Sequence, residues 1–174
     1  LRRFLKLGGL AFAGSSFLIY SCSDDDDDMR TPDPDPDPNP DPTVFDLGSG
    51  DVGILNYAYA LEQLEAAFYT AVRGGGYYAS APAEEKALFD DLYNHEVIHR
   101  EFFKAAITAA VGTGNEAMVL PELEFELPGV DLDSRDSVLA TAMALEDTGV
   151  GAYNGAGDRI ENAAYLTIAG KIVS

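Results

Sequence analysis

Residues 54–69 read ILNYAYALEQLEAAFY, and this stretch decides the fold. Its apolar side chains recur every three or four residues, which places them on one face of an α-helix. We expect this helix to begin at Asp51 as its N-cap and to end at Arg73, because three glycines follow. The apolar stripe consists of Ile54, Ala58, Leu61, Phe68 and Val72.

Carboxylates interrupt this stripe. At about 100° per residue, Glu65 falls at its centre, and Glu62 and Tyr69 fall on its edge. Burial of an unpaired ionised group is unfavourable, so carboxylates on a buried face are usually paired or bind a metal ion. The first helix therefore predicts a polar site inside the protein.

A second helix is predicted to begin near residues 80–82 and to run to about Val111. Its predicted apolar stripe consists of Leu88, Leu92, Phe103 and Ala106. Glu96 and His99 point the same way as this stripe. A Glu-x-x-His motif is therefore expected to face the carboxylates of the first helix.

The first helix has a copy later in the chain. The tripeptide Ala-Leu-Glu ends at Glu62 and again at Glu146, and a tyrosine follows each glutamate by seven residues. In this alignment Glu65 corresponds to Gly149, so Glu65 is an additional carboxylate and not half of a symmetric pair.

The remaining helices complete an all-α bundle. A third helix is predicted from Asp133 or Ser134 to about Tyr153, and a fourth begins near Glu161 and is still running at Ser174. Residues 115–133 form a long crossover with an extended stretch at 123–127. Two short connections and one long one predict a four-helix bundle over residues 49–174. We expect its fourth helix to be truncated, with a second Glu-x-x-His falling near about residue 180 if the two halves are copies.

These residues resemble the ferritin-like superfamily, and in particular bacterial ferritin-like domain proteins related to plant desiccation-related proteins. The strings that carry the resemblance are ILNYAYALEQLEAAFY, HEVIHREFF and ALEDTGVGAYNGA. In ferritin-like di-metal proteins, glutamates and Glu-x-x-His motifs from four helices hold two metal ions. The resemblance implies a di-iron or di-manganese centre, with an oxidase or stress-protection role. The implied ligands are Glu62, Glu96, His99 and Glu146, with Glu65 as an additional carboxylate.

Two other functions fit parts of the sequence. Residues 95–99 read HEVIH and match the zinc-protease signature, in which His95 and His99 bind zinc and Glu96 activates water. The chain has two histidines, which excludes a three-histidine zinc site. The candidates for a third zinc ligand are Glu122, Glu126 and Glu146. The second alternative is a non-catalytic surface scaffold that has the bundle but no functional metal site.

The N-terminal residues 1–22 predict an export signal. Three basic residues precede an apolar run that is too short to cross a hydrocarbon core of about 30 Å. The segment ends at Cys22, the chain's single cysteine, in a context that resembles a bacterial lipobox. We predict export by the Sec or the twin-arginine route, lipidation of Cys22 and attachment to a bacterial membrane. The acidic run 24–28 resembles a tag for export to the cell surface.

Charge and composition bound the remaining possibilities. Residues 23–48 form an acidic linker in which proline alternates with Asp or Asn, a pattern that favours polyproline II structure. The formal net charge of the whole chain is -19, which excludes binding to nucleic-acid phosphates. The membrane is the one partner predicted, and a homodimer is left open.

Overall fold

The computed structural model describes residues 45–172. The predicted export signal, Cys22 and most of the acidic linker lie outside these residues. Among the described residues, the regular structure is helical and contains no strand. The α-helices are α1 (Gly50–Gly74), α2 (Gly76–Ser80), α3 (Ala83–Val111), α4 (Arg135–Ala156) and α5 (Ala163–Ile172), and two 3-10 turns cover Glu116–Met118 and Gly157–Arg159. The prediction of an all-α fold is confirmed.

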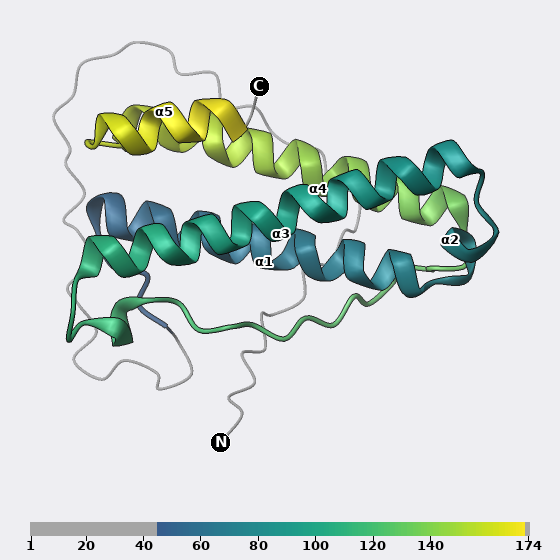
Figure 1. Cartoon of the computed structure of the whole chain (residues 1–174), viewed down its shortest axis with the longest axis horizontal. Coiled ribbons are helices and arrows are strands. Elements are labelled where there is room, and N and C mark those ends of the chain that lie inside the picture. Colours follow the sequence, from purple (N-terminus) through teal and green to yellow (C-terminus); the bar gives the residue numbers. More distant parts are fainter. Residues whose placement is uncertain (1–44, 173–174) are drawn as a thin grey trace, which may run out of the picture. The chain divides into compact units, whose positions relative to one another are not determined.

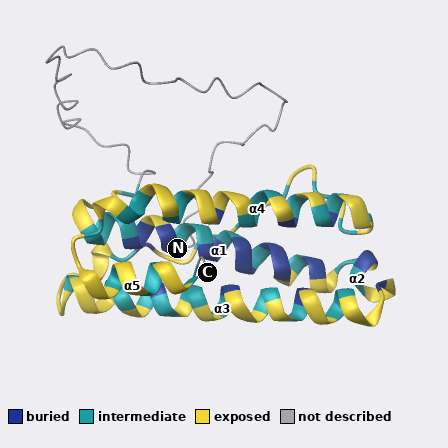
Figure 2. Cartoon of the chain, turned by 90° about the horizontal axis from the view of Figure 1, so that it is seen from above, coloured by how far each residue is buried: buried dark blue, intermediate teal, exposed yellow. Residues whose placement is uncertain are grey.

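The long helices lie side by side as a bundle. Helix α3 runs back along α1, and α4 packs against α1 from the other side (Figure 2). A long crossover joins α3 to α4 along the lower side of the molecule in Figure 1, as the sequence predicts. Helix α1 carries the largest share of buried residues, because the other elements surround it (Figure 2).

Two hydrophobic clusters fill the bundle, one toward each end. The first contains Phe68, Val72, Phe89 and Val138. The second contains Leu55, Tyr59, Phe103 and Ile107, with partly buried side chains of α5 packed against it. The residues between the two clusters on α1 and α3 include the buried Glu62, Glu65 and Glu96. The core is therefore apolar at both ends and polar across its middle.

Several local predictions are wrong in detail. Asp51 is not the N-cap of α1: the cap is Ser49, and the Asp51 carboxylate instead accepts the backbone N–H groups of Glu161 and Asn162 at 2.9 and 3.0 Å. The glycine-rich connection after α1 contains the short helix α2, which the sequence did not indicate. Residues 123–127, which the sequence predicts to be extended, contain neither helix nor strand, as expected for a crossover.

The buried stripe of α3 is also displaced from its prediction. Leu88 was expected to point inward, but it is 51% exposed, and Phe89 is buried instead. The buried residues of α3 are Phe89, Glu96, Phe103 and Ile107. Helix α3 packs mainly against α1, so its buried stripe is narrow, and Leu88 lies about 100° away from Phe89 around the helix.

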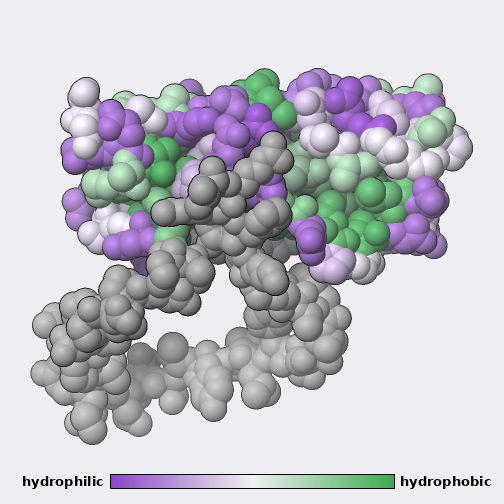
Figure 3. All heavy atoms as spheres, turned by 90° about the horizontal axis from the view of Figure 1, so that it is seen from below, coloured by the Kyte–Doolittle hydropathy of each residue, from purple (hydrophilic) through white to green (hydrophobic). Residues whose placement is uncertain are grey.

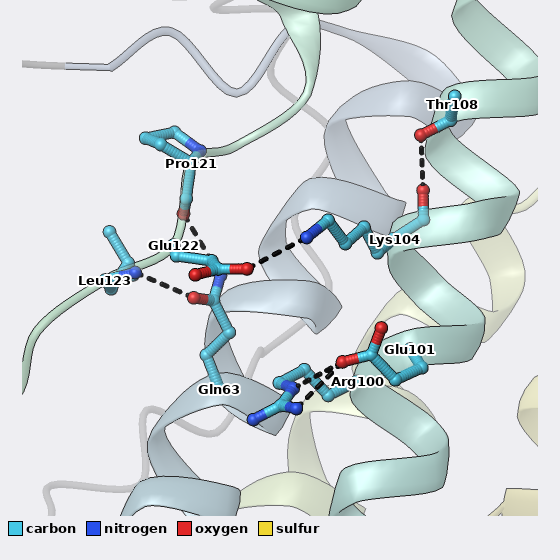
Figure 4. Close-up of polar contacts among 8 residues, drawn as sticks. All are labelled: Gln63, Arg100, Glu101, Lys104, Thr108, Pro121, Glu122 and Leu123. Carbon is cyan, nitrogen blue, oxygen red and sulfur yellow. Dashed lines mark hydrogen bonds and ion pairs between the residues drawn. The ribbon is translucent and has the colours of Figure 1, made fainter.

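Two buried amides on α1 hold the crossover in place. The Asn56 side chain donates to the carbonyl groups of Leu47 and Met118, at 3.0 and 2.9 Å, and accepts the N–H of Leu120 at 2.9 Å. Two turns later, Gln63 donates to the carbonyl of Pro121 and accepts the N–H of Leu123 (Figure 4). The crossover has no helix or strand here that could pair its own backbone groups. These hydrogen bonds from Asn56 and Gln63 pair them instead.

An exposed ion pair adds to this attachment. Lys104 of α3 lies 2.9 Å from the carboxylate of Glu122 (Figure 4). Such exposed pairs contribute little to stability, so the buried amides are the main polar attachment. The face that carries the crossover shows hydrophobic patches toward the α2 end of the molecule (Figure 3). Of the helices described, none combines the length and apolar character that crossing a bilayer requires.

Candidate metal centre

The polar middle of the bundle collects carboxylates from three helices. Helix α1 contributes Glu62 and Glu65, α3 contributes Glu96 and His99, and α4 contributes Glu146. Glu62, Glu65 and Glu96 are buried, and Glu146 and His99 are partly buried. On each helix these polar residues lie between the positions that pack into the two hydrophobic clusters, so the packing of the clusters brings them to one level.

Three of these residues form a compact group. Glu62, Glu96 and His99 each offer one ligand atom, and these atoms all lie within 4.8 Å of one another. The Nδ1 atom of His99 is 3.1 Å from Oε2 of Glu96 and 3.3 Å from Oε2 of Glu62. The contact with Glu62 has the distance of an ion pair but not hydrogen-bond geometry, so the buried Oε2 of Glu62 has no hydrogen-bond partner. A buried carboxylate oxygen left in this way is a ready acceptor for a cation.

Two tyrosines form hydrogen bonds with carboxylates between α1 and α4. Tyr69 of α1 donates a hydrogen bond of 2.5 Å to Oε1 of Glu146 on α4. Tyr153 of α4 donates to Oε1 of Glu62 on α1. The repeated Glu-to-Tyr spacing is therefore reciprocal: each tyrosine binds the glutamate of the other helix. The sequence showed the repeat but not this exchange of partners.

Glu65 occupies space that a glycine leaves open. A Cβ atom at Gly149 of α4 would lie 3.0 Å from Oε1 of Glu65. This contact explains why the alignment of the two helices matches Glu65 with a glycine. Burial, together with the neighbouring Glu62, Glu96 and Glu146, raises the pKa of Glu65 to about 9. Glu65 therefore holds a proton at neutral pH.

The neighbouring carboxylates and burial also shift the pKa values of the other groups in the centre. The adjacent carboxylates of Glu62 and Glu96 raise the pKa of His99 to about 10, so its imidazole is cationic at neutral pH. Burial raises the pKa of Glu96 and of Glu146 above the ordinary range for a carboxyl group. Burial also raises the pKa of Tyr69 and Tyr153, which keeps both hydroxyl groups protonated as donors. The site takes up protons to balance its carboxylates, and a cation would serve the same purpose.

His95, Glu122 and Glu126, which the zinc-protease alternative would use, lie outside this group. His95 is exposed and stacks its ring on that of His99 at 6.2 Å between centroids, but it is outside the group of possible ligand atoms. Glu122 pairs with Lys104 at the surface, and Glu126 is exposed. The two histidines of HEVIH thus differ in environment, whereas a zinc protease requires both at one metal ion.

A helical bundle with carboxylates and a histidine at mid-height has the arrangement that metal-binding helical bundles use. A family model described as a ferritin-like domain matches residues 50–174. The chain therefore belongs to the ferritin-like domain family. No match is found among curated proteins or among solved structures.

Proposed function

We propose that this protein binds a di-iron or di-manganese centre and uses it for oxidation of ferrous iron or for reduction of dioxygen or peroxide. The supporting observation is the group of Glu62, Glu96 and His99, whose ligand atoms lie within 4.8 Å of one another and include a buried carboxylate oxygen that has no hydrogen-bond partner. Carboxylate and imidazole donors together suit iron and manganese. Glu146 and Glu65 are the further residues that would hold the metal.

The chain's own residues prepare the site for this chemistry, in which iron or manganese would supply one-electron transfer. Tyr69 and Tyr153 each occupy one oxygen of a glutamate and so fix how the other oxygen points. Without metal, Glu65 holds a proton beside the group and faces Gly149, and a metal ion that binds to Glu65 would replace this proton. The hydrophobic clusters on both sides limit the access of water along the bundle axis.

Metal content of matched variants tests this proposal. We expect the wild-type protein and His95→Ala to retain iron or manganese, and His99→Ala and Glu62→Ala to lose most of it, as measured by elemental analysis after equilibration with each metal. His95→Ala is the matched control because it removes the same side chain one turn away. Equal loss of zinc in His95→Ala and His99→Ala, with casein cleavage by the wild type, would support a protease. Absence of metal from every version would support the scaffold alternative.

Export and lipid anchoring form the second part of the proposal. The support is the basic and apolar segment that ends at Cys22. We expect the mature protein to begin at a lipidated Cys22, and Cys22→Ala to be released from the membrane, because this one anchoring residue accounts for all of the attachment. Mass spectrometry of the native N-terminus decides between this and an unprocessed chain that keeps Arg2 and Arg3.

A further inference from the structure

The three ligand residues of the candidate metal centre differ in their access to solvent. The side chains of Glu62 and Glu96 are 1% and 6% exposed, whereas that of His99 is 23% exposed. Solvent therefore reaches the group through His99. A metal ion that binds here must exchange its hydration for protein ligands, which is costly unless donor atoms line its route.

Hydrophobic residues close both ends of the bundle axis. The cluster around Phe68 and Phe89 lies on one side of the ligand residues, and the cluster around Leu55 and Ile107 lies on the other. These side chains offer a metal ion no ligand atom, so a dehydrated ion would be strongly unfavourable among them. The route along the axis is therefore closed.

The crossover closes a third side of the bundle, opposite α5 (Figure 1). Gln63 binds the backbone of the crossover, and Lys104 pairs with Glu122 over the same stretch (Figure 4). The ammonium group of Lys104 also repels an approaching metal ion. The crossover side is therefore an unfavourable route.

The remaining side lies between α3 and α4, and two histidines lie on it. Helices α3 and α4 lie on either side of α1, and α5 lies over one end of the bundle (Figure 2). His95 and His99 are four residues apart on α3 and share one face of the helix. Their rings stack with 6.2 Å between centroids. His95 is exposed and His99 is partly buried, so the two imidazoles lead from the surface to the ligand residues.

Glu146 is the residue of α4 that faces these histidines. Burial raises the pKa of Glu146, and the imidazoles of His99 and His95 oppose this rise, so both lie within electrostatic reach of its carboxylate. Tyr69 occupies Oε1 of Glu146, which leaves Oε2 for a cation. An imidazole nitrogen and a carboxylate oxygen are donors that iron and manganese accept.

From these observations we propose that metal ions enter the centre between α3 and α4, with His95 and Glu146 as a transient binding position at the entrance. This inference rests on the proposed metal centre and adds a role for a histidine that is not a ligand of the bound ion. Because His95 acts only during passage, its loss slows entry and exit by the same factor and leaves the affinity unchanged.

Stopped-flow mixing of the metal-free full chain with Mn²⁺ tests this role. The chain has no tryptophan, so tyrosine emission, to which Tyr69 and Tyr153 contribute, reports the arrival of the quenching ion. His95→Ala should lower the association rate constant at least about fivefold, and dissociation into excess EDTA should slow by the same factor. The dissociation constant for Mn²⁺, measured by calorimetry, should stay within about twofold of the wild-type value.

Two further variants separate entry from a structural role. His95→Asp restores a donor atom at the entrance and should recover at least about half of the wild-type association rate. Asn94→Asp adds the same negative charge at the neighbouring exposed position and should keep the wild-type rates. A merely structural role of His95 would change the dissociation constant, and aspartate would not restore the rate.

The two proposals can fail separately. Wild-type rates in His95→Ala, with Mn²⁺ binding intact, would overturn the entry route and leave the metal centre standing. A slower association in His95→Ala that His95→Asp does not restore, or one accompanied by a weaker affinity, would also overturn the entry route. Absence of Mn²⁺ binding to the wild type in calorimetry would overturn both proposals.

Discussion

Replacement of Glu65 by glutamine tests whether the polar centre stores a proton. Glu65 has a pKa of about 9 in the folded protein, raised by burial and by the neighbouring Glu62, Glu96 and Glu146, against an ordinary value of 4.5. Between these two values the folded protein binds a proton that the unfolded chain has released. The free energy of unfolding must therefore fall as pH rises through this window. Glutamine has nearly the same shape, is neutral at every pH and removes this contribution.

The size of the expected stability difference follows from the pKa shift of Glu65. Each pKa unit corresponds to about 1.36 kcal/mol, and about three units of the window lie between pH 5 and pH 8. The wild type should therefore lose about 4 kcal/mol more stability over this interval than Glu65→Gln does. Contributions from other groups, His99 included, act in both proteins and largely cancel in the comparison.

Urea unfolding followed by circular dichroism, with EDTA present, measures this difference at the two pH values. Glu124→Gln is the matched control, because Glu124 is exposed on the crossover and should keep the pH dependence of the wild type. If the wild type and Glu65→Gln lose the same stability within about 1 kcal/mol, Glu65 is ionised in the folded protein and the reasoning is refuted.

Three further predictions test the surroundings of the centre. Tyr153→Phe should weaken manganese binding about 10- to 100-fold in calorimetric titrations, because the carboxylate of Glu62 loses the hydroxyl group that positions it. Tyr57→Phe changes an exposed tyrosine and should leave manganese binding unchanged. Gly149→Ala should lower the free energy of unfolding in the same urea assay by about 1–3 kcal/mol, because its Cβ would crowd the buried carboxylate of Glu65. Gly155→Ala is the control: its Cβ would have nothing within 4 Å, so it should be neutral or slightly stabilising. Asn56→Ala should lose at least about 2 kcal/mol, because it leaves buried backbone groups of the crossover unpaired, and a loss below about 0.5 kcal/mol by urea unfolding would contradict the role of its amide.

Helical periodicity carried most of the fold prediction. It located the long helices to within a few residues, because apolar stripes and glycine stops are local signals. It also placed Glu62, Glu96 and His99 on inward faces, and the structure brings those three together. Leu88 shows its limit: a stripe in the sequence does not say how many neighbours a helix has, and α3 packs mainly against one.

Contacts between distant segments could not be predicted from helical periodicity. The exchange of partners between Tyr69 and Tyr153 depends on how α1 and α4 are aligned along their axes, which no single helix determines. The attachment of the crossover depends on Asn56 and Gln63, which are seven residues apart on the buried face of α1. The spacing of the two amides is visible in the sequence. Their hydrogen-bond partners are backbone groups, which every residue has, so the sequence does not reveal them.

The attachment of the crossover to α1 also bears on how this connection can diverge among relatives. Within residues 118–123, Asn56 and Gln63 form hydrogen bonds with backbone atoms, so side chains that point away from the core there are free to change. The exceptions concern proline: Leu120 and Leu123 must each supply an N–H, which proline lacks. Residue 121 supplies only a carbonyl, and it is a proline in this chain. An alignment of relatives should therefore show two amides on the first helix facing a connection whose outward-pointing side chains vary and whose residues 120 and 123 are not proline.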